Sequence, residues 1–563
     1  MPVYFRTNTS TTILDAQNRE ADETVCWSIL GASQGRSSAQ SIQTNSIVNT
    51  SEYPLVIRSF ICCWMCLPLL GWSLTECVQG KDNPRPNILL IFADDHSAKT
   101  LSCYERAYPL ASTPNIDRLA AQGVRFSAGY MGSWCMPSRA SLLTGLHPHG
   151  IQSMRKEGTY PGSTYDPMLC PFWPSTFRQH GYRTAQVGKW HTGVDAGWGR
   201  DWDDQYVWNR PDNPDNADSY YKDQVVDING KRQTVTGYPT DNYTRWACDY
   251  IRNHAQQSDK PWYLWLCYGA IHGPTTPAQR HQGQLSGKPS PLPIDILGPR
   301  SGKPSYLADR QAWEKNDRGE VVMSKTGQPH SQWMQQVNEC MMSVDEGVGQ
   351  LIEALKESGQ WENTLIIYTS DQGFANGEHG LRQKVAPYEA TYASPLIASF
   401  PGKIPAGRYC PHSVNSPDLV VTLFAWAGIE LPWKMHGRDF SRLMRDPDNS
   451  TWNHPTLFEH TGDDFGSNVT RSVLSEPIAE HAGVPYYVAI RQGQWKYIFY
   501  LQRSEPDELY DIQQDPDEQN NLANSPDFQK RRAEMHQTLV AELERSDAKF
   551  VSLLEQRHKS SGQ

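Results

Sequence analysis

Residues 87–95 have the sequence Asn87-Ile88-Leu89-Leu90-Ile91-Phe92-Ala93-Asp94-Asp95. The apolar part is short and uncharged, which is typical of a parallel strand that is buried on both faces. In open α/β sheets, sites form beyond the carboxyl ends of the strands. The stretch therefore predicts a central strand that delivers Asp94 and Asp95 to a site.

Helix and strand patterns alternate beyond this stretch. Thr113 is a good N-cap, Pro114 fits the first helical position and Gly123 fits a helix stop, so a helix is predicted between them. The next strand is predicted to start at residues 124–126, and residues 262–266 form another apolar run. Alternation of this kind predicts an α/β sheet.

A second strand with a polar end is predicted at residues 364–368, followed by Ser370-Asp371-Gln372-Gly373. Residues with helical spacing precede it as far as a stop at Gly359: Val344, Val348, Leu351, Ile352 and Leu355. Asp94, Asp95, Asp371 and Gln372 would then meet as hard oxygen donors, which suit Ca²⁺ or Mg²⁺. An Asp after a strand often serves only as a turn or helix cap, and that alternative stays open on the pattern alone.

A cysteine motif lies between these two strands. Residues 135–145 run Cys135-Met136-Pro137-Ser138-Arg139, then Ala140-Ser141-Leu142-Leu143-Thr144-Gly145. An arbitrary free cysteine is usually inert packing. Here the whole run resembles the signature of type I sulfatases, the formylglycine-dependent, arylsulfatase-like family. The resemblance implies that a maturation enzyme oxidises Cys135 to formylglycine, whose hydrate attacks sulfur as a covalent nucleophile.

Three further segments are similar to the same family. They are Gly181-Tyr182-Arg183-Thr184 through Gly188-Lys189-Trp190-His191, then Tyr268-Gly269-Ala270-Ile271-His272-Gly273-Pro274, and Gly377-Glu378-His379-Gly380 through Lys384. Taken alone, Lys189 and His191 could belong to an exposed polar loop, and a lone histidine such as His272 is weak evidence. The resemblance makes them site residues and places His379 nearby without a role.

The resemblance implies a complete set of site roles. One Ca²⁺ is held by Asp94, Asp95, Asp371 and Gln372 together with the modified Cys135, although Asn is commoner than Gln at position 372. Lys189, His272 and Lys384 bind the substrate, the two lysines by neutralising sulfate oxygens. Arg139 supports the hydrate, His272 protonates the leaving alcohol, and His191 takes the second hydrate proton.

The resemblance also implies an architecture. It spans residues 84–525 and predicts an alkaline-phosphatase-like α/β sandwich with a large, mostly parallel sheet in residues 81–450. A smaller C-terminal subdomain with an antiparallel sheet is expected in residues 451–563, with strands at 491–497 and 508–512. The tail at 528–554 is predicted to be one amphipathic helix.

Residues 1–80 differ from the rest of the chain. Residues 1–50 are rich in Ser, Thr, Asn and Gln and predict a disordered extension. Arg58 followed by the apolar residues 59–72 resembles a secretory signal core, although it begins late, and a buried core segment is the alternative. The run is too short for a comfortable membrane span. We therefore expect a secreted or periplasmic protein with no stable membrane span in the mature chain.

The composition of the chain favours some classes of substrate over others. The net charge of −10 gives no reason to expect a nucleic-acid partner. The chain has 19 Trp and 26 Tyr, and aromatic faces stack on sugars as well as filling cores. Residues 196–221 are predicted to form a packed aromatic loop and residues 274–332 a long insertion beside the cleft. A sulfated polysaccharide or oligosaccharide is favoured over a small aryl sulfate.

Two other functions stay open on the sequence. A phosphoester or phosphonate hydrolase of the same superfamily would share the metal and the nucleophile, although the paired lysines favour sulfate. A catalytically inactive protein that binds sulfated glycans is disfavoured by the intact motifs. Five of the 12 cysteines lie in residues 1–80. Apart from Cys135, the others are scattered and show neither a zinc site nor a disulfide framework, although a single bridge stays open: Cys103, Cys170, Cys248, Cys267, Cys340 and Cys410.

Overall fold

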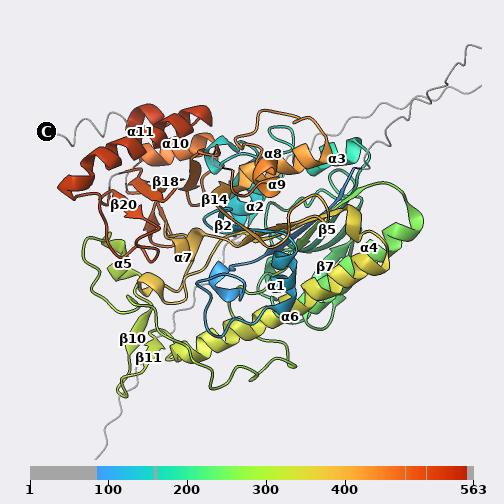
Figure 1. Ribbon diagram of the computed structural model, residues 1–563, viewed down its shortest axis with the longest axis horizontal. Helices are drawn as coiled ribbons and strands as arrows, with labels where there is room; N and C mark the ends of the chain where they lie inside the picture. The colour runs from blue at the N-terminus through green and yellow to red at the C-terminus, as the bar shows by residue number, and fades with distance from the viewer. Residues whose placement is uncertain (1–84, 157–161, 450, 476, 503, 555–563) are drawn as a thin grey trace, which may run out of the picture. The chain divides into compact units, whose positions relative to one another are not determined.

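A ten-stranded sheet forms the centre of the computed structural model, which describes residues 85–156, 162–449, 451–475, 477–502 and 504–554 (Figure 1). The strand order is β14-β2-β13-β12-β1-β9-β5-β6-β7-β8. These strands are β1 (Asn87–Ala93), β2 (Val124–Tyr130), β5 (Arg183–Trp190), β6 (Asp204–Asn209), β7 (Gln224–Ile228), β8 (Lys231–Val235), β9 (Trp262–Cys267), β12 (Thr364–Ser370), β13 (Leu396–Ser399) and β14 (Arg408–Asn415).

The middle of the sheet is parallel. Strands β12, β1, β9, β5 and β6 run in one direction, whereas β13, β7 and β8 pair antiparallel to their neighbours. The side chains of residues 88–93 are almost completely buried, as the apolar run predicted. The β1–β12 register pairs Ala93 with Ser370, so Asp94 and Asp371 emerge side by side.

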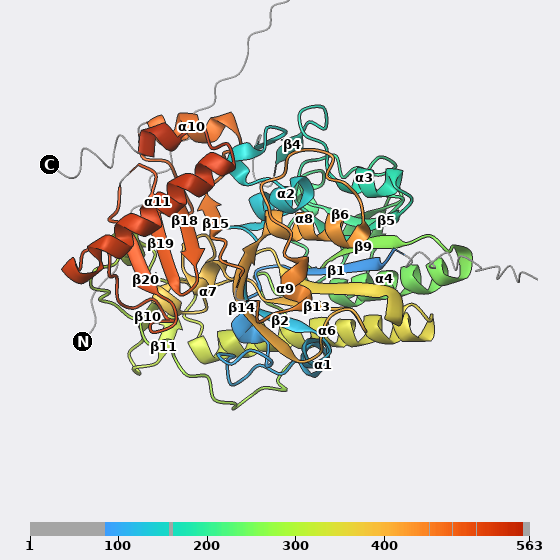
Figure 2. The same ribbon diagram turned by 45° about the horizontal axis from the view of Figure 1, so that its top comes forward.

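Helices cover both faces of the sheet (Figures 1 and 2). One apolar cluster joins Leu89 and Ile91 to α1 (Pro114–Ala121), α4 (Pro239–Gln257) and α6 (His330–Glu357). The opposite cluster joins Ile88, Leu90 and Phe92 to α2 (Cys135–Thr144), α3 (Pro174–Gln179), α8 (Ser416–Ala427) and α9 (Ser441–Arg445). The predicted α/β sandwich with a mostly parallel sheet is confirmed.

A four-stranded antiparallel sheet follows in the C-terminal part, as predicted. Its order is β15 (Thr456–His460), β18 (Tyr487–Gln492), β19 (Trp495–Tyr500) and β20 (Glu508–Asp511). Helices α10 (Ser467–Leu474) and α11 (Gln529–Arg545) bury one of its faces, and the other packs against α7 (Glu389–Tyr392) and β2. The remaining elements are α5 (Tyr306–Asp309), β3 (Met154–Lys156), β4 (Ser163–Tyr165), β10 (Trp313–Lys315), β11 (Val321–Met323), β16 (Glu480–His481), β17 (Val484–Pro485) and six 3₁₀ turns within the described ranges.

Several predicted boundaries were wrong. The expected strand at 491–497 is a hairpin that turns at Gly493, and the tail helix ends at Arg545 rather than continuing to 554. The aromatic segment 196–221 contains β6 of the main sheet, and α6 begins at His330, inside the predicted insertion. Thr113 precedes α1, but its hydroxyl binds Ser102 and Asp117 instead of capping the helix.

The expectations for residues 1–80, for the cysteines and for a membrane span can be compared only with the described residues. The extension and signal-like segment at 1–80, with its five cysteines, lie outside the described residues. The seven cysteines within the described ranges are all free. No helix in the described part of the chain combines the length and apolar character needed to cross a bilayer.

Candidate active site

Three carboxylates converge where β1 and β12 end. One carboxylate oxygen from each of Asp94, Asp95 and Asp371 lies within 4.8 Å of the other two, and all three residues are buried. The Asp95 backbone N–H donates to Asp371 Oδ1 at 3.0 Å, and Asp95 has a left-handed φ of 53°. Asp tolerates this conformation better than most residues, which lets the chain turn sharply after β1.

Three cations approach these carboxylates from different elements. Lys189, near the end of β5, donates from Nζ to Asp94 Oδ2. Arg139, on α2, donates to Asp371 Oδ2 at 3.0 Å, and Lys384 donates to Asp95 Oδ1 at 2.7 Å. A buried carboxylate is costly unless it is paired, so the cations stabilise a cluster that would otherwise repel itself.

The surrounding charges and burial shift the pKa values of Asp94 and Asp371 in opposite directions. Burial raises the pKa of Asp94, but Lys189 above all, with His272, Arg139 and Lys384, brings it well below the usual range. Burial and the charge of Asp94 raise the pKa of Asp371, against the opposing effect of Arg139. A bound cation would favour the ionised form of both groups.

Cys135 is the first residue of α2 and lies inside this cluster. Its Sγ donates to Asp94 Oδ1 at 3.2 Å and accepts from Lys384 Nζ at 3.1 Å. Burial, with a contribution from Asp94, raises the pKa of the thiol to about 12. The unmodified thiol is therefore protonated at neutral pH and is a poor nucleophile.

The donor set fits a hard divalent cation. Three carboxylates in one buried cluster are the oxygen ligands that Ca²⁺ prefers. Gln372 presents its Nε2 group to Asp95 Oδ1 and, at 3.7 Å, to Cys135 Sγ, while its Oε1 accepts from Ser138 at 3.3 Å. A ligand role for Gln372 therefore requires its amide to be reversed.

His272 borders the cluster on its open side. Its Nε2 lies 3.6 Å from Asp95 Oδ2, and its Nδ1 donates to the Gly273 carbonyl at 2.6 Å. Tyr220 stacks on the ring with centroids 4.2 Å apart. Burial lowers the pKa of His272 to about 3, against the effect of Asp95, so the ring is neutral near pH 7.

His191 contacts Arg210 and Trp134. Arg210 donates to its Nδ1 at 3.2 Å, and its ring lies edge-on to Trp134, the neighbour of Cys135. Burial and the Arg210 charge hold the pKa of His191 well below its ordinary value. To accept a proton at Nδ1, the ring would have to be released by Arg210.

The structure brings most of the predicted site residues into one contact network: Asp94, Asp95, Cys135, Arg139, Lys189, His272, Asp371, Gln372 and Lys384. Sequence reasoning missed Arg210 and Tyr220, for which the aromatic content of residues 196–221 was the only signal. His379 is occupied elsewhere, because its Nδ1 lies 2.8 Å from Asp295 Oδ2 and its ring packs on Tyr388.

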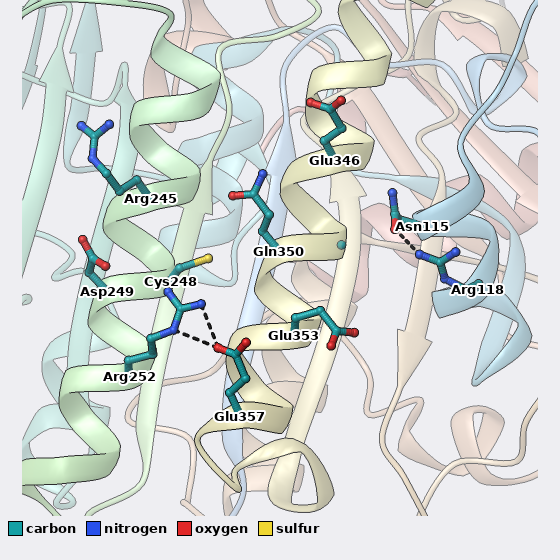
Figure 3. A pocket seen from close by; sticks show the side chains of 11 residues that line it. Asn115, Arg118, Arg245, Cys248, Asp249, Arg252, Glu346, Gln350, Glu353 and Glu357 are labelled. Atoms are coloured by element: carbon teal, nitrogen blue, oxygen red, sulfur yellow. Dashed lines mark hydrogen bonds and ion pairs between the residues drawn. The ribbon is translucent and has the colours of Figure 1, made fainter.

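The structure also contains a groove and a cavity whose lining residues do not belong to this contact network. A groove of about 560 Å³ lies between α1, α4 and α6, where Arg252 pairs with Glu357 (Figure 3). A cavity of about 980 Å³ is lined by residues 291–295, Glu378 and His379 together with C-terminal loops. Part of the predicted insertion at 274–332 therefore lines this cavity, and His379 is another of its lining residues.

Comparison with known proteins gives two family matches. The model described as Sulfatase matches residues 86–429, and the model described as N-sulphoglucosamine sulphohydrolase, C-terminal, matches residues 377–545. An N-acetylglucosamine-6-O-sulfatase of Bacteroides thetaiotaomicron is 26% identical over 532 residues, which cover 84% of this chain and 89% of that protein.

Solved structures share the fold. One, described as a complex with its substrate D-glucosamine-2-N,6-O-disulfate, has a TM-score of 0.69 and 25% identity, and the match covers 83% of this chain and 99% of that chain. The phosphonate monoester hydrolase of Agrobacterium radiobacter has a TM-score of 0.63 at 21% identity, with 82% and 96% covered. The second likeness concerns the fold alone.

Proposed function

Because the chain belongs to the sulfatase family and is therefore a sulfuric ester hydrolase, we propose that it desulfates a sulfated oligosaccharide or polysaccharide, with formylglycine made from Cys135 as nucleophile and one Ca²⁺ as cofactor. The observation that carries the proposal is the position of Cys135. Its Sγ contacts both Asp94 and Lys384 at the start of α2, inside a cluster of three carboxylates and three cations. The Sγ atom stands in for an oxygen of the hydrated aldehyde.

The carboxylates at the ends of β1 and β12 would bind the metal ion. Asp94, Asp95 and Asp371 would hold the ion together with the modified residue 135, and Gln372 would join them through its oxygen. When bound, Ca²⁺ polarises the sulfate and favours the reacting oxyanion. The two clusters of described residues that could hold a cation share Asp94, which supports a single ion.

Lys384 is the cation placed to bind the sulfate, and the other two cations pair with carboxylates. Lys384 reaches the nucleophile position and Asp95 together, so its Nζ can donate to a sulfate oxygen next to the attacking group. Lys189 is fully buried and pairs with Asp94. Arg139 stays paired with Asp371 and holds the carboxylate that faces the hydrate.

Two histidines would move the protons. His272 protonates the sugar oxygen as its bond to sulfur breaks. In the same step one hydrate hydroxyl bonds to sulfur and gives its proton to Asp94 Oδ1, the acceptor that Cys135 Sγ contacts at 3.2 Å. The neutral ring must first gain a proton at Nε2, which the negative charge of a bound sulfate favours. His191 takes the proton of the second hydroxyl when sulfate leaves and the aldehyde re-forms, once Arg210 releases its Nδ1.

A glycan substrate is supported by the relatives. One relative is named N-acetylglucosamine-6-O-sulfatase, and one similar structure is described as a complex with its substrate D-glucosamine-2-N,6-O-disulfate. The model described as N-sulphoglucosamine sulphohydrolase, C-terminal, matches residues 377–545. The phosphonate hydrolase alternative rests on fold alone. Secretion or export to the periplasm stays a prediction from residues 58–72, and the division into a catalytic part at 81–450 and a subdomain at 451–563 is likewise proposed.

The direct test is a desulfation screen. Full-length protein, shown by peptide mass spectrometry to carry formylglycine, is incubated with sulfated glycans, 4-nitrophenyl sulfate, and phosphate and phosphonate esters. We expect sulfate release from at least one saccharide, with a higher kcat/KM than for any phosphorus ester. Preferential cleavage of a phosphonate ester, or no sulfate release at all, would contradict the proposal.

A further inference from the structure

Arg382 is a cation beside the site that has no hydrogen-bonded or ion-paired anion among the described residues. Its guanidinium makes no hydrogen bond or ion pair with the described part of the chain, and its Nε atom is buried without a partner. By contrast, each of the three cations around Cys135 contacts one of the clustered carboxylates. An arginine remains charged at all ordinary pH values. Burial lowers the pKa of Arg382, and the nearby charge of Asp95 opposes this only in part, so no carboxylate is paired directly with this cation.

Trp333 holds the Arg382 side chain in a defined place. The guanidinium carbon lies 4.2 Å from the centre of the indole ring. Trp333 is buried near the start of α6, and its Nε1 donates to Asn376 Oδ1 at 2.9 Å, which fixes the ring. Stacking covers a face of the guanidinium and leaves its edge free of the ring, so the Nη groups, unlike the buried Nε, can donate to a ligand. Arg382 is therefore oriented before any ligand arrives.

Arg382 lies on the open side of the site. The side chains of Lys384 and His272 keep 18% and 20% of their surface exposed, whereas that of Asp95 keeps 4%. Arg382 precedes Lys384 by two residues, and its Nη2 would lie 3.7 Å from a Cβ placed on Gly273, the neighbour of His272. A substrate whose sulfate reaches Lys384 therefore brings its other substituents past Arg382.

We propose that Arg382 binds a second anionic group of the substrate, on the sulfated sugar or on its neighbour. The inference rests on the proposed function and narrows its substrate class to saccharides that carry a sulfate, sulfamate or carboxylate besides the sulfate that is removed. The planar guanidinium pairs with such oxyanions through two parallel hydrogen bonds. The ligand charge also offsets the cost of leaving a half-buried arginine unpaired.

A purely structural Arg–Trp stack is the competing explanation, and the chain offers a matched control for it. Arg445, at the end of α9, has its guanidinium carbon 4.0 Å from the centre of the Trp426 ring. Arg445 is exposed and lies outside the site network. Replacing either arginine by glutamine removes one charge and one stack, but only Arg382 is placed to meet the substrate.

The test measures binding without turnover. Full-length Cys135→Ala protein in a Ca²⁺ buffer is titrated calorimetrically with three ligands. These are N-acetylglucosamine-6-O-sulfate, D-glucosamine-2-N,6-O-disulfate, and a disaccharide that joins a uronic acid to N-acetylglucosamine-6-O-sulfate. The titrations are repeated with Arg382→Gln, Arg382→Lys and Arg445→Gln added, and thermal melting checks that each variant is folded.

We expect at least one of the two dianionic ligands to bind about 10- to 100-fold more tightly than the monosulfate, the range for a charge-assisted hydrogen-bonded pair. Arg382→Gln should abolish that preference, Arg382→Lys should restore part of it, and Arg445→Gln should preserve it. Equal affinity for all three ligands, a preference that survives Arg382→Gln, a uniform loss for every ligand, or no binding of any ligand would each overturn the inference. Failure of the proposed function would appear instead as no turnover by formylglycine-containing protein, which is measured separately.

Discussion

Replacement of His272 by alanine should slow a sulfated sugar far more than an activated aryl sulfate. The Nδ1 of His272 is committed to the Gly273 carbonyl and Tyr220 fixes the ring plane, so only Nε2 is aimed at the substrate side. The variant therefore loses one proton donor, and general acid catalysis is worth about 10²–10⁴-fold. A sugar alkoxide is a strong base that needs this proton, whereas nitrophenolate leaves without it.

The assay compares kcat/KM for a sulfated saccharide and for 4-nitrophenyl sulfate in the same protein preparations. His272→Ala should lower the first by about 10²–10⁴-fold and the second far less. Lys384→Ala is the matched comparison, because Lys384 also contacts Asp95 and is similarly exposed but would bind the sulfate that both substrates share. It should slow both substrates by similar factors. Equal losses on both substrates for His272→Ala would refute the acid role and make His272 a sulfate-binding group.

Three further predictions follow from the site and its surroundings. Asp371→Asn should weaken Ca²⁺ binding by calorimetry and lower the rate in parallel, since one formal charge leaves a hard-cation site; unchanged affinity would remove Asp371 from the ligand set. Exhaustive chelation should lower the melting temperature, and Ca²⁺ at about 100 times Kd should restore about 2.7 kcal/mol; an unchanged melting curve would contradict the site. Burial lowers the pKa of His149, but the adjacent Glu459 raises it above the ordinary value overall, so the pair stabilises the fold fully below about pH 6.5 and less as pH rises through the folded pKa. The stability gap between wild type and His149→Gln should therefore shrink with rising pH in urea titrations, and a gap that grows would contradict the ion pair.

Much of the site could be predicted because its residues follow local patterns. Asp94 and Asp371 come directly after strands β1 and β12, each of which contains an apolar run, and parallel strands in register bring their ends together. Cys135 and Arg139 lie one helical turn apart on α2, so a short motif carries both. The central strands were recognisable for the same reason, since burial on both faces leaves an uninterrupted apolar run.

The missed features depend on contacts between distant parts of the chain. Arg382 can be recognised as a site residue only from its position beside Trp333 and Gly273. Tyr220 can be recognised only from its stacking on the His272 ring. Strand β6 has polar residues at both ends and only Tyr206, Val207 and Trp208 between them, so it lacked a long apolar run and was hidden among similar loop residues. Gly493 was a local signal for a turn, and its φ of 58° in the structure fits that role. The sequence-based prediction nevertheless treated the two short strands on either side of it as one.

The central claim is that formylglycine at position 135 is the nucleophile of sulfate-ester hydrolysis. Preparations made with increasing amounts of a maturation enzyme would differ in the fraction of Cys135 converted, which peptide mass spectrometry measures as the replacement of the thiol by an aldehyde. The turnover rate per chain on one sulfate ester should rise in proportion to that fraction and extrapolate to nearly zero for the unmodified thiol. Full activity in a preparation whose residue 135 is entirely cysteine would contradict the claim.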